Sequence, residues 1–466
     1  MARTRGWKVL VLEKHYRIGG FTHTFSRPKG FEFDTGTHYI GELQKEGDLR
    51  TLLDYLTRGE LQWAPLPHEF EEIIIPNFHW KIPGSRAEHL RRLIDEFPKE
   101  KQSLELYFDE ETKVAEAYST WQLAEQSSKL IAAFIRGSLY LRRKALFETT
   151  ENALNRRFHD PRLKAILSAR WMGYGVPPQQ SSFGMHCLHS FHYGEGAWFP
   201  VGGGQMISDS LAETIRAVGG EVKTRAAVAE IIVQDNCAQG VRYRGPEDLE
   251  SKLVRSARII SGVGAINTYL NLLKNFETSI SKKVQETPAG ESVLSLFLQL
   301  KESPRRHGFD AVNYWLIPDS SPRVADKESI LSKDFTSFLS FPSLKRNSTA
   351  HTAQLIVMAR NSLFEGLERE SSAYRELKES LATAMIAVIE SHFPNFTELV
   401  ETAELSTPRT VERFVSTPSG AVYGLPTSPD RFFQPWAQSR TPIRNLYLTG
   451  TDPQCQDRCR PENLNS

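Results

Sequence analysis

The chain has 466 residues, enough for two or three domains that each bury a core of their own. Its 57 basic and 56 acidic residues leave a net charge of +1, which argues against nucleic acid as a partner. Its 4 cysteines are too few and too scattered for a disulfide framework. Cys455 and Cys459 have no second pair or histidine cluster beside them, so no metal site is predicted.

Membrane insertion and export are not predicted either. No run of about 18 apolar residues occurs, so we expect no membrane-spanning helix. The apolar run near the start, residues 9–12, is too short for the core of a signal peptide. Taken as written, the chain is expected in the cytosol.

The first block, residues 8–65, opens with an apolar run that predicts a buried strand ending at Glu13. In dinucleotide-binding folds an acid at this place accepts hydrogen bonds from ribose hydroxyls, and a glycine-rich turn lies about 20 residues before it. Only 12 residues precede Glu13, so we expect an incomplete nucleotide-binding unit. Gly19 and Gly20 follow the strand, and Gly36 after Asp34 marks backbone that bends sharply.

The second block, residues 66–193, begins with two short strand patterns and then becomes helical. Residues 118–143 carry small and apolar side chains at helical spacing, which predicts one long helix. The end of this pattern, residues 139–144, mixes bulky apolar and basic side chains. Two interpretations stay open: a packed helix with a solvated basic end, or a face that rests on a membrane surface.

The remaining three blocks alternate helices and strands. Residues 194–291 predict a helix after Gly202 to Gly204 and then a small sheet with a turn at Asp235 and Asn236. Residues 292–402 predict strands and a long helix over 374–393. Residues 403–466 close with an apolar strand that runs into Gly450 and Asp452. We expect these blocks to interleave.

Three distant segments share one character, an apolar strand that ends in glycine or an acid. They are residues 9–13, 259–264 and 446–452. In open α/β sheets, ligands bind beyond the carboxyl ends of parallel strands. Each segment alone also fits ordinary turn chemistry, so only the set points to a binding site.

Together and in this order, the segments resemble the phytoene desaturase-type flavoproteins. The motifs are Glu13 with Gly19-Gly20, Gly-Phe-Glu-Phe-Asp-Thr-Gly at 30–36, Trp-Phe-Pro-Val-Gly-Gly at 198–203 and Leu-Tyr-Leu-Thr-Gly-Thr-Asp at 446–452. A closer resemblance is to the retinol saturases, the all-trans-retinol 13,14-reductases. It is carried by residues 8–14, 33–41, 61–66, 174–177, 182–186, 312–315, 338–343 and 420–424, and it covers about residues 7–453.

The resemblance implies an α/β fold in which an incomplete, Rossmann-like FAD lobe interleaves with an α+β substrate lobe. Residues 1–65, 194–291 and 403–466 would form the first lobe, and residues 66–193 and 292–402 the second, which would cover an apolar tunnel for a polyene. The implied cofactor is FAD. Its implied contacts are Glu13, Arg17, Gly19, Gly20, Val228, Gly450 and Asp452. Where many relatives have arginine after the paired glycines, this chain has Phe21.

The implied reaction is saturation of one carbon–carbon double bond in a retinoid. Electrons would come from the reduced flavin, with NAD(P)H as a candidate source, and a proton from a nearby side chain. His38 and Tyr39 are the candidate proton donors, with His192 and Tyr193 also near; each also fits a structural role in the core. The resemblance further implies association with the endoplasmic reticulum membrane, by peripheral contact.

Two alternatives stay open. After Asp452 the chain is polar and interrupted by proline, where the resemblance implies a helix directed at the flavin. With the incomplete nucleotide-binding start, this allows a truncated, non-catalytic isoform of the enzyme. The other alternative is a different flavoprotein oxidase or desaturase that acts on a carotenoid or an amine.

Overall fold

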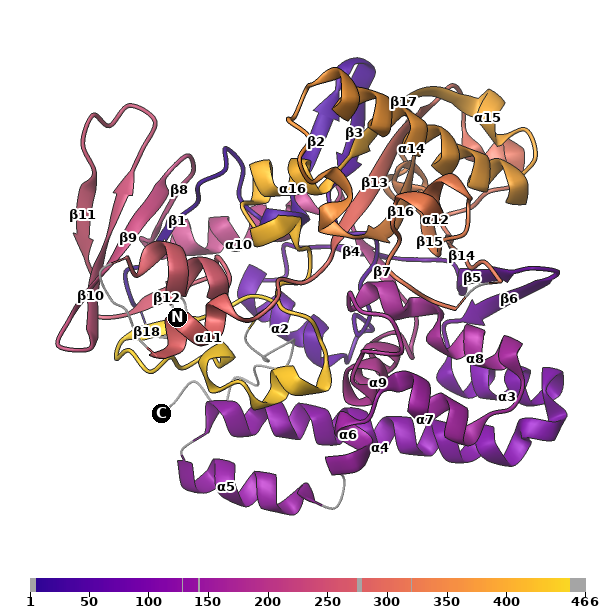
Figure 1. The fold of residues 1–466 in the computed structure, drawn as a ribbon, viewed down its shortest axis with the longest axis horizontal. Helices are drawn as coiled ribbons and strands as arrows, with labels where there is room; N and C mark the ends of the chain where they lie inside the picture. Colours follow the sequence, from indigo (N-terminus) through magenta and orange to yellow (C-terminus); the bar gives the residue numbers. More distant parts are fainter. Residues whose placement is uncertain (1–5, 128, 141–142, 275–278, 320, 453–466) are drawn as a thin grey trace.

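The computed structural model describes residues 6–127, 129–140, 143–274, 279–319 and 321–452. Cys455, Cys459 and the polar tail after Asp452 lie outside these residues. Segments from the beginning, middle and end of the chain lie side by side on the left of Figure 1, around strands β1, β8 to β12 and β18.

Two short parallel pairs and an antiparallel sheet make up this left-hand part. Strand β1 (Leu10–Leu12) pairs with β8 (Glu221–Lys223), and β12 (Ile259–Ser261) pairs with β18 (Leu446–Leu448). The described residues form no strand that joins the two pairs into one sheet. The mixture of helices and parallel strand pairs agrees with the predicted α/β fold. Helix α10 (Gln205–Ala217) follows Gly204 as expected and packs near β8.

The antiparallel sheet consists of β9 (Ala227–Gln234), β10 (Cys237–Arg244) and β11 (Lys252–Arg255). Asp235 and Asn236 connect β9 to β10, with φ angles of 49° and 55°. Two successive left-handed residues are typical of the type I′ turn, which Asp and Asn tolerate and which matches the twist of a hairpin. The turn predicted at these residues is therefore confirmed.

A seven-stranded mixed sheet occupies the upper right of Figure 1. Its strands, in spatial order, are β17 (Val400–Ser406), β13 (Ser292–Leu300), β16 (Thr352–Ala359), β15 (Ser337–Ser340), β14 (Asn313–Leu316), β5 (Glu69–Ile75) and β6 (Phe78–Pro83). Only the β14–β5 contact is parallel among these neighbours. The sheet thus combines residues from the second and fourth sequence blocks, and β17 extends across the expected boundary at 402/403.

Helices cover the sheet on the lower side of Figure 1 and at its right-hand edge. The lower group is α3 (Arg86–Glu96), α4 (Lys101–Gln126), α5 (Lys129–Ser138), α6 (Arg143–Phe147), α7 (Thr150–Arg157), α8 (Pro161–Ser168) and α9 (Phe183–His192). The long helix predicted over 374–393 is confirmed as α14 (Ser372–His392), whose first turn is capped by the Ser371 hydroxyl. No helix in the described ranges is long and apolar enough to span a bilayer.

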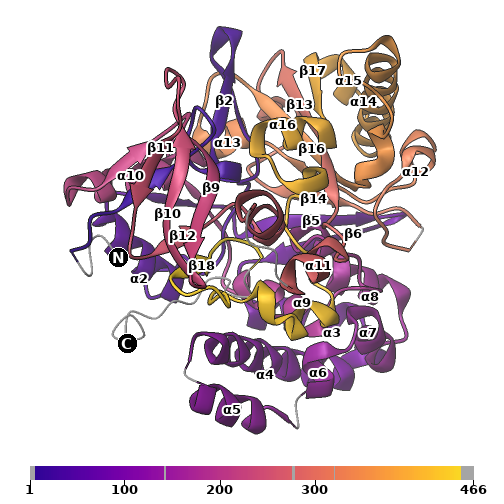
Figure 2. The same ribbon diagram turned by 60° about the vertical axis from the view of Figure 1, so that its left-hand side comes forward.

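The single helix predicted over 118–143 is wrong. Helix α4 ends at Gln126, since Ser127 adopts an extended conformation with φ −87° and ψ 169°, and α5 is a separate helix. Serine favours helix ends because its hydroxyl competes for backbone hydrogen bonds. Figure 2 shows the result, with α5 lying below α4 at the margin of the molecule.

The other elements bridge these parts. The hairpin of β2 (Thr24–Arg27) and β3 (Phe31–Asp34) rises next to the large sheet, and β4 (Trp63–Pro65) pairs with β7 (Trp198–Pro200). Helix α2 (Asp48–Thr57) packs on α10. The short helices are α11 (Ser279–Gln285), α12 (Lys327–Leu331), α13 (Pro342–Arg346), α15 (Phe396–Leu399) and α16 (Pro408–Val415).

Candidate functional site

Glu13 directly follows β1, as predicted, and its carboxylate accepts a hydrogen bond from the His15 amide at 2.7 Å. The amide of Ala226 donates to the carbonyl of Glu13 at 2.8 Å, which brings the start of β9 and Val228 close to this strand end. The structure therefore places Glu13 and Val228 in the same neighbourhood, although they are far apart in the sequence.

Gly19 and Gly20 form a left-handed turn beside α10, with φ angles of 113° and 56°. A Cβ atom on Gly19 would lie 2.6 Å from the Ser208 hydroxyl, so only glycine lets this loop approach the helix so closely. Phe21 packs against Gly36; a Cβ atom on Gly36 would lie 3.0 Å from the Phe21 Cβ. The side chain at 21 thus supports the sharp bend near Asp34.

Arg17 bonds to the protein itself. Its guanidinium donates to the carbonyl of Thr24 at 2.6 Å and to the Thr24 hydroxyl at 3.2 Å, which ties the loop to β2. Arg17 also lines an open hollow of about 440 Å³ that it shares with Gln205, Met206 and Asp209 of α10. Arg17 therefore has a structural role in this loop, and its expected contact with phosphate stays a prediction.

Asp452 is buried and joins three distant segments. Its two carboxylate oxygens accept hydrogen bonds from the amides of Ala265 at 2.5 Å and Leu425 at 2.8 Å. Arg431 donates to the carbonyl of Asp452 at 2.8 Å. By contrast, Gly450 has φ of 97°, and a Cβ atom there would make only an ordinary van der Waals contact, 3.9 Å from the carbonyl oxygen of Gly262. Close approach of a ligand is thus possible at Gly450, while Asp452 already holds the loops around it.

The segment from Asp34 to Tyr39 lies between the two halves of the molecule. Asp34 is fully buried at the end of β3, and its Oδ1 accepts hydrogen bonds from the Gly204 amide at 2.8 Å and from Arg346 Nη2 at 2.5 Å. Burial raises the pKa of Asp34, although the nearby Arg346 guanidinium opposes that change. The carboxylate therefore links β3, the start of α10 and helix α13.

His38 is buried beside Phe338, with ring centroids 5.2 Å apart. Neither ring nitrogen has a hydrogen-bond partner among the described residues. Burial, with a smaller contribution from the Lys345 ammonium, lowers the pKa of His38 to about 3. The imidazole is consequently neutral at physiological pH, and it cannot act there as an imidazolium acid.

Tyr39 is held by a buried carboxylate. Its hydroxyl donates to Glu71 Oε1 at 2.6 Å, and Glu71 also accepts from Trp315 Nε1 at 2.8 Å and from Arg170 Nε at 2.6 Å. Burial and the Glu71 charge raise the pKa of Tyr39 well above its ordinary value. The phenol therefore stays protonated and points at a fully buried acid.

His192 and Tyr193 lie next to the segment that contains Tyr39 and Gly41. His192 accepts from the Gly41 amide at 2.9 Å, and its other ring nitrogen lies 3.0 Å from Glu42. The Tyr193 ring lies 4.6 Å from that of Tyr39. His192 thus supports the turn after Tyr39, and the structure brings all four candidate side chains to one region.

A cavity beside Tyr193 measures about 40 Å³, and its lining mixes apolar side chains with the charged ones of Arg86, Glu111 and Arg170. This volume accommodates one or two water molecules but not a polyene. The apolar tunnel implied by the resemblance therefore stays a prediction.

Sequence reasoning missed Glu71 and Lys345. Glu71 shares a strand face with Ile73 and Ile75, so an acid on an apolar face was the available signal. Lys345 is buried, and its Nζ donates to the carbonyl of His38 at 2.8 Å, Asn313 Oδ1 at 2.6 Å and Ser340 Oγ at 2.7 Å. Burial lowers the pKa of Lys345 to about 7, and the charges of Asp34 and Glu71 act against this change.

The sequence model of the family described as flavin containing amine oxidoreductase matches residues 3–454. The chain belongs to this family. Membership makes it a flavoprotein oxidoreductase, in agreement with the predicted enzyme class and flavin cofactor.

Within the amine oxidoreductase family, the chain is similar to proteins named all-trans-retinol 13,14-reductase. The one from Danio rerio is 32% identical over 96% of this chain and 79% of that protein, and the one from Rattus norvegicus is 30% identical over 96% and 78%. A Danio rerio protein named inactive all-trans-retinol 13,14-reductase is 25% identical over 96% and 78%. The chloroplastic prolycopene isomerase of Daucus carota is 26% identical over 96% and 72%.

Solved structures show the same fold. An oxidoreductase from Methanosarcina mazei superposes with a TM-score of 0.62 at 13% identity, covering 96% of this chain and 89% of that one. Cyclohexylamine oxidase from Brevibacterium oxydans superposes with a TM-score of 0.60 at 15% identity, covering 97% and 89%. At such identities these likenesses establish the fold alone. They agree with the predicted α/β flavoprotein architecture.

Proposed function

We propose that the chain is an FAD-dependent oxidoreductase that saturates a carbon–carbon double bond of a retinoid. The observation that carries this proposal is the similarity over 96% of the chain to all-trans-retinol 13,14-reductases at up to 32% identity. The amine oxidoreductase family itself spans several substrate classes, but the prolycopene isomerase relative also acts, by its name, on a polyene. An apolar polyene is therefore the substrate class that the relatives favour.

FAD binding is proposed at the two groups of residues described above. Glu13, Val228, Gly19 and Gly20 would hold the adenosine and phosphate end, with Arg17 beside it. Gly450 and Asp452 would face the ribityl chain. The lack of close contacts around Gly450 supports this role, and each Asp452 oxygen retains a second lone pair after its bond to a backbone amide. When bound and reduced by the electron source, the flavin would supply the two electrons that the reduction requires.

The matching lobe assignment is residues 1–65, 194–291 and 403–466 for FAD and residues 66–193 and 292–402 for substrate. It is supported by the grouping of β1, β8 to β12 and β18 in Figure 1 and by the seven-stranded sheet, except that strand β17 of this sheet extends past residue 402 to Ser406. The turn with His38 and Tyr39 lies against that sheet, through Glu71 of β5. Its position favours this turn as the place where the substrate double bond is oriented.

Proton donation is proposed for the pair His38 and Tyr39. The Tyr39 hydroxyl donates to Glu71, so it can protonate a substrate carbon only after exchanging that hydrogen bond. Neutral His38 has an N–H group but no imidazolium proton, because its pKa is about 3. Of the two, Tyr39 is the favoured donor, because its hydroxyl is hydrogen-bonded to Glu71, a carboxyl group that can take part in proton transfer.

The electron source and the membrane contact are proposals of the same kind. NAD(P)H is the proposed reductant, directly or through a partner protein.

Peripheral contact with a membrane, such as that of the endoplasmic reticulum, is supported by the exposed apolar side chains of α5. An enzyme for a water-insoluble polyene gains access to its substrate by resting on a bilayer.

The test is to purify the chain, add FAD, measure the visible absorbance of bound flavin and then offer retinol under anaerobic reducing conditions. We expect a yellow protein and a product two mass units heavier than retinol. A colourless protein without turnover would favour the non-catalytic isoform. Turnover of a carotene or an amine instead would favour the other flavoprotein classes, and NADH, NADPH and dithionite arms identify the reductant.

A further inference from the structure

Helix α13 presents two consecutive cations to the same short segment. Arg346 Nη2 donates to Asp34 Oδ1 at 2.5 Å, and Lys345 Nζ donates to the carbonyl of His38 at 2.8 Å. The Arg346 side chain is 6% exposed and that of Asp34 is fully buried. One five-residue helix therefore holds both ends of residues 34–38.

The glycines before α10 make this approach possible. A Cβ atom on Gly203 would lie 2.4 Å from Arg346 Nη2, and one on Gly204 would lie 3.0 Å from Asp34 Oδ1. Side chains at these positions would push the guanidinium away from the carboxylate. The local backbone is thus built around the Arg346–Asp34 pair.

Lys345 is anchored in the large sheet by its other two hydrogen bonds, to Asn313 of β14 and Ser340 of β15. Asn313 is the direct register partner of Glu71 on β5, and Glu71 binds the hydroxyl of Tyr39. Three adjacent strands, β15, β14 and β5, therefore hold this segment. Ser340 and Asn313 hold the carbonyl of His38 through Lys345, and Glu71 holds the phenol of Tyr39. With Asp34, the segment is fixed at three points.

Stability alone is a poor reason for a buried lysine here. Removing an ammonium from water is costly, and well-packed apolar residues often replace buried ions without loss of stability. All three N–H bonds of Lys345 are used, and each of them orients a polar group near the candidate site. This geometry suits a residue whose role is to hold the His38 carbonyl in a fixed place relative to β14 and β15.

We propose that Lys345 and Arg346 form a two-point clamp that positions residues 34–39 for the flavin and its substrate. This inference rests on the proposed function for its purpose, and both cations are positioning residues. Because both cations act on one short segment, loss of either cation should loosen the positions that the other one holds. The effects of the two single variants should then overlap instead of adding.

The test compares Lys345→Met, Arg346→Met and the double variant with Lys301→Met. Lys301 is a matched control, since this exposed lysine also donates to a backbone carbonyl, that of Glu398 at 2.8 Å. Amide hydrogen exchange of a peptide spanning residues 34–40 reports on the clamp without any cofactor. We expect exchange about tenfold faster in both single variants, little further gain in the double variant and no change in the control.

Flavin affinity, the visible spectrum and the separate values of kcat and KM are the second readout. We expect weaker flavin binding, a shifted visible band and a reduced kcat for the single variants. Unchanged exchange and an unchanged spectrum would overturn the clamp, even if the melting temperature falls. If Lys345→Met fails to fold, Ser340→Ala, which removes one partner and keeps the charge, must give the same local exchange increase. A wild-type chain that binds no flavin would overturn the proposed function, while the exchange result would still decide the clamp.

Discussion

At the scale of single residues, Glu71 is the residue on which the candidate site depends most. This fully buried carboxylate receives hydrogen bonds from a tyrosine, a tryptophan and an arginine. Removing one partner of a buried ion pair leaves the other charge without compensation, which costs far more than the net value of the pair. Arg170 is the cation that would be left.

We therefore expect Glu71→Gln to lower the free energy of unfolding by about 3 kcal/mol. The neighbouring Glu72→Gln is the control, because Glu72 pairs with His79, whose side chain is 58% exposed, and such pairs contribute about 1 kcal/mol or less. Urea unfolding followed by circular dichroism measures both. Equal losses for the two variants would show that the buried network is not important for stability.

The proton-donor proposal is tested by the double variant His38→Gln, Tyr39→Phe. Loss of the donor removes general acid catalysis, which contributes typically 10² to 10⁴-fold, so kcat should fall by at least about 100-fold with little change in flavin content. Steady-state turnover of retinol provides the measurement. Full activity in this variant would rule out both residues, and the separate single variants show which of them acts.

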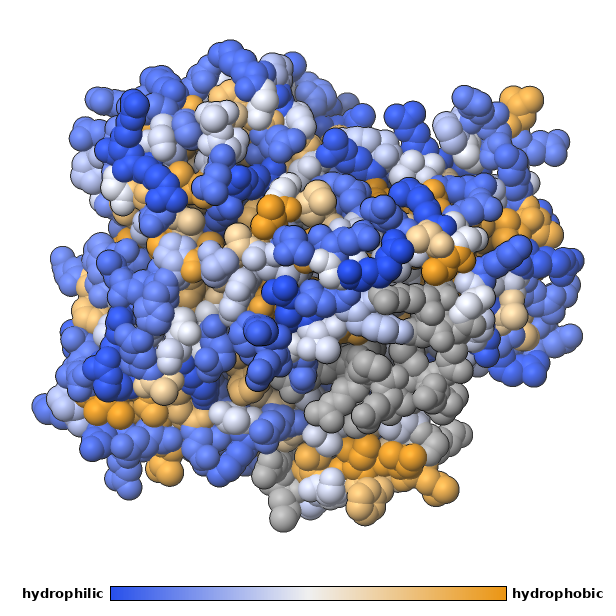
Figure 3. All heavy atoms as spheres, turned by 180° about the vertical axis from the view of Figure 1, so that it is seen from behind, coloured by the Kyte–Doolittle hydropathy of each residue, from blue (hydrophilic) through white to orange (hydrophobic). Residues whose placement is uncertain are grey.

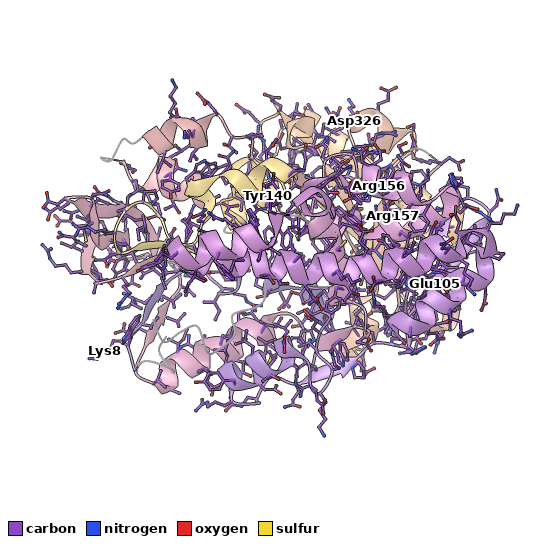
Figure 4. All side chains as sticks on the ribbon, turned by 90° about the horizontal axis from the view of Figure 1, so that it is seen from below. Lys8, Glu105, Tyr140, Arg156, Arg157 and Asp326 are labelled. Atoms are coloured by element: carbon purple, nitrogen blue, oxygen red, sulfur yellow. The ribbon has the colours of Figure 1, made fainter. Side chains whose placement is uncertain are left out.

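At the scale of elements, helix α5 is the most exposed apolar surface of the described chain. Leu130, Phe134 and Ile131 are 85%, 78% and 54% exposed, and Tyr140 just after the helix is 68% exposed. Figure 3 shows an apolar patch along the lower edge at this position, and Figure 4 shows Tyr140 beside the helices on the underside. Between Glu125 and Glu148 the sequence has five basic residues and no acid. Apolar and basic side chains together suit an anionic lipid surface.

Replacing Leu130 and Phe134 by glutamate should abolish co-sedimentation with vesicles that contain anionic lipid, and high salt should weaken binding of the wild type. Leu249→Glu is the control, because this leucine is 95% exposed on a different part of the molecule. Light scattering of the free protein tests a second explanation for the exposed patch, which is self-association. If the patch instead mediates self-association, the wild type will be a dimer and will ignore vesicles.

At the scale of the whole molecule, buried neutral histidines shape the response to acid. Burial lowers the pKa of His38 and His89 to about 3 and that of His186 to about 4, whereas an unfolded histidine titrates near 6.5. The unfolded state therefore binds more protons as pH falls below 6.5, and the folded state loses stability in that range.

Each of the three histidines should cost about 2 kcal/mol of unfolding free energy at pH 5 relative to pH 7. Urea midpoints measured from pH 7 to pH 5 should fall steeply. The variant His38→Gln should make the slope shallower, because one of the buried neutral groups is removed, while His189, whose pKa burial also lowers well below its ordinary value, keeps contributing. A slope that does not change in this variant would contradict neutral burial of His38.

Local patterns in the sequence predicted the elements that depend on neighbouring residues alone. The Asp235-Asn236 turn, the helix after Gly204 and the long helix near 374–393 follow from turn chemistry, caps and helical spacing, and all three are confirmed. The break between α4 and α5 was missed, because apolar spacing continues across Ser127 while the backbone does not. The motif order, together with the family resemblance, also led to the flavoprotein class.

Only the tertiary structure decided how the site is assembled. Glu71, Lys345 and Arg346 are distant in sequence from Asp34 to Tyr39. The apolar strand face around Glu71 is a local signal, but nothing local distinguishes Lys345 and Arg346 from ordinary charged residues. The pairing of β14 with β5 puts Asn313 next to Glu71, and helix α13 turns two cations toward one segment. Strand ends such as Glu13 and Asp452 can be predicted from local order, but burial and hydrogen-bond partners depend on the whole chain being folded.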